Sequence, residues 1–163
     1  MLARQSKKKI LTSLVDILVN NQSGSLNKSP DSKYGEYLEL CESVRREVEN
    51  LLNSHAPFLS FASHLSELHC SVLNYGIPDF TTHSFSSEQK QLQLCKIIEE
   101  KIRTFEPRFK TVNVFLKQRD AVKDRTVRFR IEGTIYAEPA PELIVLDSHL
   151  QTESGAFVVF YDD

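Results

Sequence analysis

The spacing of apolar residues changes at Pro107, and this change constrains the fold more than any other feature of the sequence. Between residues 94 and 105, apolar side chains recur at steps of three and four, which is the spacing of one helix face. Between residues 111 and 116 they alternate with their neighbours, as in a strand with one buried face. Proline lacks an amide donor and disfavours helical geometry at the residue before it. The sequence therefore predicts a helix that ends at Pro107 and a strand that follows it.

Two segments precede this helix: the first is predicted to be another helix and the second a packed loop. A stripe at steps of four and three covers about residues 37–54 and predicts a helix. Its members are Tyr37, Cys41, Val44, Val48 and Leu51. Residues 55–85 lack a firm period, and we expect a packed loop with one helical turn near residues 65–72. The helix that stops at Pro107 is predicted to begin at Ser86, because Gln89 stands three positions later, as in a capping box.

The N-terminal part differs in character from the rest. Residues 7–20 can form a short helix with one apolar face. Residues 20–33 are polar and contain a glycine and a proline, which is typical of a linker. We therefore expect an N-terminal helix and linker over residues 1–33 and a single domain over residues 34–163.

Strand patterns dominate the second half of the chain. Residues 126–138 alternate strictly between apolar and polar, and Gly133 interrupts the apolar face in the manner of a bulge. Residues 143–146 and 156–161 are apolar runs separated by the turn-like sequence DSHLQTESG. Helices first and strands second indicate an α+β fold. We expect N-terminal helices packed on one face of a C-terminal, mainly antiparallel sheet of three to four strands.

Charge and cysteine content narrow the function classes. The 163 residues carry a formal net charge of −2, so a nucleic-acid binder is disfavoured. The three cysteines are odd in number and widely spaced, which does not indicate a disulfide framework. The basic start of the chain is followed by an apolar stretch that polar residues interrupt, and we expect no signal peptide and no membrane insertion. These features favour a cytoplasmic protein.

Three patterns could carry catalysis or bind a metal. Asp147, Ser148 and His149 are the residue types of a hydrolytic triad, but consecutive strand residues point to opposite faces. We interpret them as a strand end that enters a turn. His64, His69 and Cys70 do not have the spacing of a metal site, and no second ligand pair follows them. With only five scattered glycines there is also no phosphate-binding loop, so we expect no metal and no cofactor.

Glu106 is one candidate acid for a glycosidase-like reaction, which needs a second carboxylate such as Asp120 or Glu132 across a cleft. Arg108 stands two positions from Glu106 and favours the charged form of a carboxylate, whereas a general acid must hold its proton. The pattern therefore disfavours catalysis. It indicates a fixed, charged corner that either braces the fold or presents Arg108 to a partner.

The last apolar run, residues 156–161, offers a different function. If this strand lies at the edge of the sheet, its backbone could accept a strand from another chain. A central position, covered on both faces, is equally compatible with the sequence.

Several stretches in one order resemble a known family. They are SVRREVENLLNSH (43–55), SVLNYGIPDF (71–80), IEEKIRTFEPRFKTVNV (98–114), RFRIEGTIYAEPAPE (128–142) and VLDSHL followed by GAFVV. Together they resemble the TssE subunits of the type VI secretion baseplate, which are similar to the gene-25-like wedge proteins of phage baseplates. The resemblance runs over about residues 37–161, although residues 55–70 do not align with it.

The resemblance implies a structural role without enzymatic activity. Members of this family join the wedge subunits TssF and TssG, with TssK as a further candidate partner, in the cytoplasm at the membrane-docked baseplate. They are thought to start polymerisation of the TssB/TssC sheath by strand exchange. Glu106, Pro107 and Arg108 stand at the family's Glu-Pro-Arg motif, which implies partner binding there. Some phage relatives carry a lysozyme-like label, so a peptidoglycan hydrolase is the alternative function.

Overall fold

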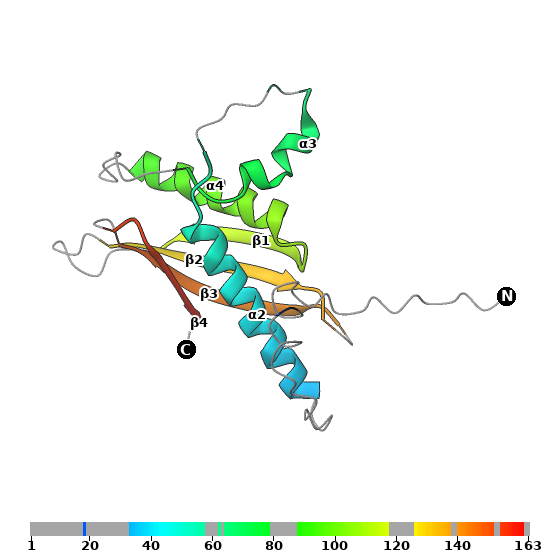
Figure 1. The fold of residues 1–163 in the computed structure, drawn as a ribbon. Coiled ribbons are helices and arrows are strands. Elements are labelled where there is room, and N and C mark those ends of the chain that lie inside the picture. Colours follow the sequence, from blue (N-terminus) through cyan, green and yellow to red (C-terminus); the bar gives the residue numbers. More distant parts are fainter. Residues whose placement is uncertain are drawn as a thin grey trace.

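The fold consists of two long helices and one antiparallel sheet, as a computed structural model shows it (Figure 1). The structure describes residues 18, 33–57, 62, 64–78, 88–117, 126–137, 140–151 and 154–161. The predicted helix over residues 7–20, the linker over residues 20–33 and the cap at Ser86 lie outside the described residues, apart from Leu18 and Lys33, which are helical.

The first long helix, α2, spans Lys33–Asn53 and begins earlier than the sequence predicted. Its predicted stripe is confirmed, because Cys41, Val44, Val48 and Leu51 are buried and Tyr37 packs against the core. The second long helix, α4, spans Glu88–Phe105 and therefore ends two positions before Pro107. Its buried positions match the helical spacing and include Leu94, Cys95, Ile98 and Ile102.

The sheet has four strands in the order β1-β2-β3-β4, and each strand pairs antiparallel with the next. The strands are β1 (Phe109–Leu116), β2 (Val127–Ile135), β3 (Glu142–Leu150) and β4 (Phe157–Tyr161). Helix α4 packs against β1, and α2 packs against β4 (Figure 1). One face of the sheet and the inner faces of both helices form a single core. This arrangement confirms the expected α+β class with helices on one face.

The irregularity in the sheet lies in β1 and not at Gly133, where the sequence predicted a bulge. The register between β1 and β2 shifts between Phe109 and Thr111, whereas Gly133 pairs regularly with Val112 and Ile144. A side chain at position 133 would collide with the Phe109 ring and approach the Thr111 carbonyl oxygen. Gly133 is therefore required by the close approach of Phe109.

Strand β3 is longer than the sequence indicated. It continues through Asp147, Ser148 and His149 to Leu150, so the interpretation of these residues as a strand end entering a turn was wrong. The reason is backbone pairing, because each of the three is opposite a residue of β2 and a residue of β4. The turn that follows is correspondingly shorter.

The predicted helical turn near residues 65–72 exists as α3 (Ser66–His69), followed by the 3-10 helix η1 (Val72–Asn74). Neither element contains a buried residue, and α3 projects from the body of the domain in Figure 1. Lys101 of α4 donates hydrogen bonds to the backbone and side-chain oxygens of Asn74 and so anchors the end of this projection. Among the helices in the described part of the chain, none has the length and apolar character needed to span a bilayer.

Candidate interaction site

The Glu106-Pro107-Arg108 corner connects the end of α4 to the start of β1. The amide of Glu106 still donates to the Ile102 carbonyl, 2.9 Å away, and the amide of Phe109 donates to the Glu106 carbonyl. The corner is therefore continuous with both elements. Glu106 and Arg108 are only 3% and 4% exposed, whereas Pro107 between them is exposed.

Arg108 uses its whole guanidinium group inside the protein. Its Nε and Nη2 atoms donate to the two carboxylate oxygens of Glu106 at 2.7 and 2.6 Å, a bidentate geometry. Its Nη1 donates to the Ser43 hydroxyl at 2.9 Å, and Nη2 also donates to Glu47 at 2.8 Å. Because Ser43 and Glu47 belong to α2, the corner ties the start of the sheet to the first long helix.

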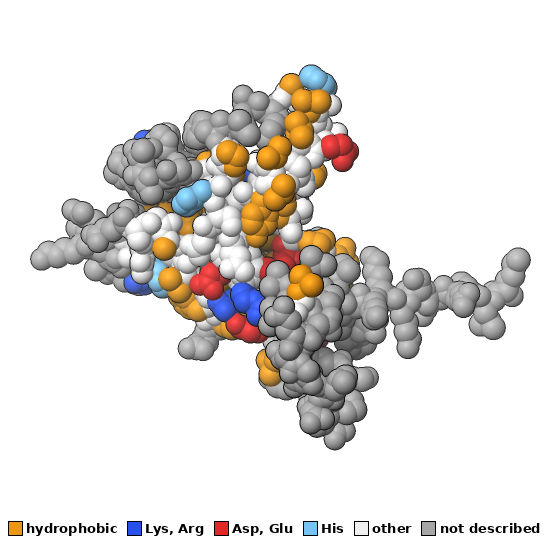
Figure 2. All heavy atoms as spheres, in the orientation of Figure 1, with side chains coloured by type: hydrophobic (Ala, Val, Ile, Leu, Met, Phe, Trp, Pro, Cys, Tyr) orange, Lys and Arg blue, Asp and Glu red, His pale blue; other side chains and the backbone are white. Residues whose placement is uncertain are grey.

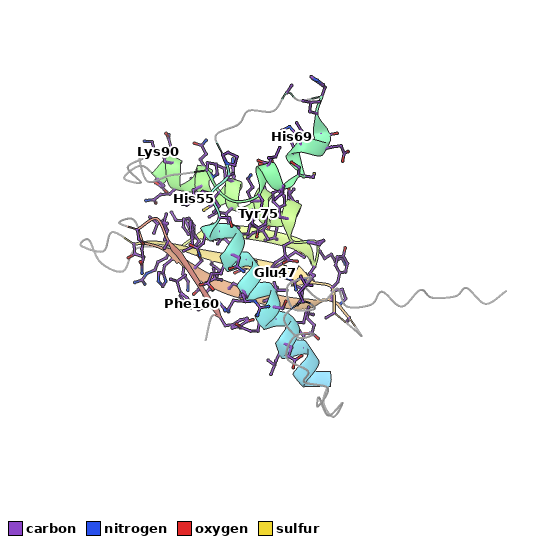
Figure 3. All side chains as sticks on the ribbon, viewed as in Figure 1. Glu47, His55, His69, Tyr75, Lys90 and Phe160 are labelled. Carbon is purple, nitrogen blue, oxygen red and sulfur yellow. The ribbon has the colours of Figure 1, made fainter. Side chains whose placement is uncertain are left out.

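The residues around this corner form one charged and aromatic cluster. In Figure 3, Glu47 on α2 and Tyr75 lie on neighbouring elements. Burial, and then the nearby carboxylates of Glu47 and Glu106, raise the pKa of Tyr75 above its usual value. The Tyr75 ring packs edge-on against Phe105 at the end of α4, with ring centroids 5.4 Å apart. The corner is thus embedded in the body of the protein.

This geometry does not provide a general acid and a second carboxylate across a cleft. Both oxygens of Glu106 accept hydrogen bonds from Arg108. Glu132 lies within β2 between Asn113 and Val145, on the face of the sheet that is turned away from the core. Asp120, the other predicted candidate, lies outside the described residues. The arrangement of Glu106 and Arg108 can brace three elements, and its chemistry is that of a buried ion pair.

The triad residue types also take separate faces, as expected for consecutive strand positions. Ser148 is buried opposite Phe129 and Val159, on the core side. Asp147 and His149 lie on the outer side, where the His149 ring contacts Phe160, with centroids 5.4 Å apart. Ser148 therefore cannot receive help from His149.

The outer face of the sheet carries an ion cluster that the sequence analysis missed. Asp147 is bound by Lys117 at the end of β1 and by Arg130 on β2, where Arg130 Nε lies 3.2 Å from the carboxylate. Asp147 and Arg130 are directly paired in the register, which only the strand pairing reveals. Beside them lies a depression of about 690 Å³, lined also by Arg128, His149 and Phe160. Ser148 also lines this depression, but it faces the core, so among the described residues His149 does not lie on its side of the sheet to act as a base.

The histidines and the cysteine that were considered as metal ligands in the sequence analysis are exposed and do not form a cluster. His64, His69 and Cys70 all have exposed side chains, and Figure 3 places His69 beside α3. Within the described part of the chain, no three side chains of histidine, cysteine, aspartate or glutamate come together as metal ligands would.

Strand β4 lies at one edge of the four-stranded sheet, so the edge position is the correct one of the two alternatives. The expected open template is not present, however, because α2 runs along this strand and its polar side chains bind the β4 backbone. Arg45, Glu49 and Asn53 make these contacts. The sequence signal for them was their regular spacing of four, which resembled a solvated helix surface.

Comparison with known proteins agrees with the architecture. The sequence model of the family described as baseplate wedge protein gp25 matches residues 38–140. A search of curated proteins found no match. Among solved structures, a chain from the baseplate complex of the type VI secretion system is similar to this fold, with a TM-score of 0.51 and 19% sequence identity. The alignment covers 72% of this chain and 98% of that chain.

Proposed function

This chain belongs to the family of the baseplate wedge protein gp25, and from this membership we propose that it is a structural component of a type VI secretion baseplate. The single observation that carries the proposal is the family match, which extends from α2 through β2 and includes the Glu106-Pro107-Arg108 corner. The similar fold in a type VI baseplate complex supports the same system. The role is an assembly role without catalysis, supported by the buried ion pair at Glu106.

The partners follow from the proposed position in the baseplate. The chain joins the wedge subunits TssF and TssG, contacts TssK at the membrane-docked baseplate in the cytoplasm, and starts the TssB/TssC sheath by strand augmentation. Strand β1, the other edge of the sheet, supports the last step, because a sheet edge can accept a further strand through main-chain hydrogen bonds. Each such bond contributes only about 0.5–1.5 kcal/mol net, so several copies must act together.

The Glu-Pro-Arg corner contributes to partner binding through its exposed residue. Pro107 stands on the surface, and the buried ion pair of Glu106 and Arg108 fixes its position. A rigid, pre-ordered contact loses little conformational freedom on binding. Arg108 itself acts as a positioning residue in this proposal, because its guanidinium is committed to Glu106, Ser43 and Glu47.

Co-purification tests this proposal. A tagged full-length chain should recover TssF and TssG from cells that produce them, and cryo-electron microscopy of the complex should place it in the wedge. Pro107→Ala should reduce recovery, whereas Pro57→Ala, which changes an exposed proline beyond the end of α2, should not. Melting temperatures of both variants must match the wild type for this comparison. Recovery of neither wedge subunit by the wild-type chain would refute the proposed role.

The alternative function is a lysozyme-like peptidoglycan hydrolase, which some relatives' label suggests. It predicts lysis of purified cell walls by the protein and loss of lysis in Glu106→Gln. We expect no lysis above background, because both carboxylate oxygens of Glu106 are bound by Arg108.

A further inference from the structure

The outer face of the sheet is the face turned away from α2 and α4. Both helices pack against the opposite face, where the single core lies (Figure 1). The register places Phe115 of β1 and Phe160 of β4 at the two ends of one row across the outer face. Their side chains remain 50% and 42% exposed. Aromatic and arginine side chains together on an exposed face are typical of a protein interface.

The depression on this face carries an excess of positive charge. Lys117, Arg128 and His149 line it. The one carboxylate among the lining residues that the structure describes is Asp147, which Lys117 and Arg130 both bind. Three permanent cations therefore stand around a single anion.

Neighbouring parts of the sequence do not cancel this excess. The segments that connect the strands at this end of the sheet, residues 118–125 and 151–156, together contain three basic and three acidic residues. The next carboxylate along β2, Glu132, is not among the residues that line the depression. Lys117, Arg128 and Arg130 have further contacts of their own within the chain, so it is their summed charge that attracts an anion.

The helix side of the molecule has a different balance of charge. There Arg45 of α2 forms ion pairs with two carboxylates, those of Glu42 and Glu49, at 2.7 and 2.8 Å. Figure 2 shows acidic and basic side chains gathered together where α2 passes β4. Positive charge is matched within the chain on that side, whereas it exceeds negative charge at the depression. Charge complementarity therefore favours an acidic partner at the depression.

The spacing of the cations suits an extended segment. Arg128 and Arg130 are two positions apart on β2, so they point to the same face and lie about 7 Å apart along the strand. Alternate side chains of an extended peptide have the same spacing. A segment with carboxylates at alternate positions can therefore meet both arginines at once, with Phe160 beside it as an apolar contact.

We propose that the outer face of the sheet, at the depression lined by Lys117, Arg128 and Phe160, binds an extended acidic segment of another protein. Carboxylates at alternate positions of that segment contact the cations, and an apolar side chain packs against the Phe160 ring. This surface is separate from Pro107 and from the β1 edge. It goes beyond the proposed assembly role and does not depend on it.

Binding of a labelled peptide tests the proposal. The probe is a fluorescein-labelled decapeptide with glutamate at alternate positions, serine between them and leucine at the end. Its control has glutamine in place of every glutamate. Fluorescence anisotropy with the full-length chain should show that the glutamate peptide binds about tenfold more tightly than the control, or better. Added salt should weaken this binding, because it screens charges on an exposed face.

Variants assign the binding to the depression. Arg128→Gln should weaken binding of the glutamate peptide about five- to tenfold, because it removes one cation. Lys117→Gln changes a more exposed side chain of the same depression and should act in the same direction. The matched control is Lys90→Gln, which removes the same charge from α4, away from Phe160 in Figure 3, and should leave binding unchanged. Melting temperatures must show that each variant is folded in the assay.

Asp147→Asn separates a binding role from a role in folding. It removes the carboxylate that repels an incoming one, and binding of the glutamate peptide should become about twofold tighter or more. A variant that merely loosened the fold would bind more weakly. Binding that weakens in folded Asp147→Asn would contradict the proposal.

Nuclear magnetic resonance of the isotope-labelled full chain locates the peptide. Its addition should shift the amide signals of Arg128, His149 and Phe160 and leave that of Lys96 on α4 in place. Equal binding of the two peptides, an unchanged affinity in both Arg128→Gln and Lys117→Gln, or shifts centred on another surface would each overturn the proposal. Tighter binding of an oligo-uridine RNA than of the glutamate peptide would also overturn it and assign the face to nucleic acid. Failure to recover TssF or TssG would leave it intact.

Discussion

Arg108 and Glu106 form a bidentate ion pair, with contacts of 2.7 and 2.6 Å, between two side chains that are both almost fully buried. Only Pro107 separates them in the sequence, so the pair closes a tight corner between α4 and β1. The same guanidinium reaches Ser43 and Glu47 on α2. The guanidinium of Arg108 therefore connects α4, β1 and α2, and its removal should affect the stability of the fold.

Loss of that cation should destabilise the fold strongly. Arg108→Met leaves the buried Glu106 carboxylate without its partner, which costs about 3–5 kcal/mol in the free energy of unfolding. Urea denaturation followed by circular dichroism measures the change. Adding Glu106→Gln removes the uncompensated charge and should recover part of the loss. If Arg108→Met unfolds at the urea concentration of the wild type, the corner is not the brace that its contacts indicate.

Gly133 should not tolerate a side chain, because the ring of Phe109 occupies the space where a Cβ atom would lie. Gly133→Ala forces the ring or the β1 backbone to move, and we expect a loss of about 1–3 kcal/mol in the free energy of unfolding. Gly35→Ala is the matched control, since nothing lies within 4 Å of a Cβ atom there. That substitution, within α2, should stabilise by about 0.5–1 kcal/mol.

A double-variant cycle identifies the cause of the Gly133 effect. Phe109→Leu removes the ring edge, so Gly133→Ala should cost less in that background than in the wild type. Equal costs in both backgrounds would show that the ring is not the obstacle.

The sequence alone was sufficient for the parts of the fold that depend on local spacing. The stripe from Cys41 to Leu51 and the stop at Pro107 were predicted because burial on one helix face and the chemistry of proline are local properties. The extension of β3 through Asp147 was not predicted. Asp147 and His149 are polar, and strand pairing rather than their own preference places them in the sheet.

The candidate site was likewise predictable from the sequence only where it depends on neighbouring residues. The sequence indicated that Glu106 and Arg108 form a charged corner, but their burial depends on α2, which lies about sixty positions earlier. Arg45 and Glu49 lie off the predicted apolar stripe of α2, and no role was predicted for them from the sequence. Their contacts to Val159 bridge more than a hundred positions, and no periodicity in α2 reveals what lies beside it.

The three cysteines should differ sharply in reactivity. Cys41 and Cys95 are buried, and burial raises the pKa of both thiols, that of Cys95 to about 11. Cys70 is exposed on the projection that carries α3. Because the thiolate is the reactive form, a disulfide exchange reagent at pH 8 should label Cys70 quickly and the other two only after unfolding in urea. Cys70→Ser should have no quickly labelled thiol, and fast labelling of all three in the native wild type would contradict the described core.

Asp147 should make the free energy of unfolding depend on pH in the acidic range. Burial alone would raise the pKa of this carboxyl, but hydrogen bonds and charges from Lys117 and Arg130 outweigh it and hold the pKa below its usual value. A carboxyl with a lowered pKa in the folded state adds stability above the unfolded pKa of about 3.9, and this contribution disappears as the pH falls through the folded value.

Asp147→Asn should therefore be less stable than the wild type by about 1–2 kcal/mol at pH 7. The difference should shrink below about pH 4. Urea unfolding of both proteins between pH 7 and pH 3 measures it, with Glu132→Gln on the same outer face as the control. A difference that stays constant over this range would mean that Lys117 and Arg130 do not stabilise the ionised form of Asp147.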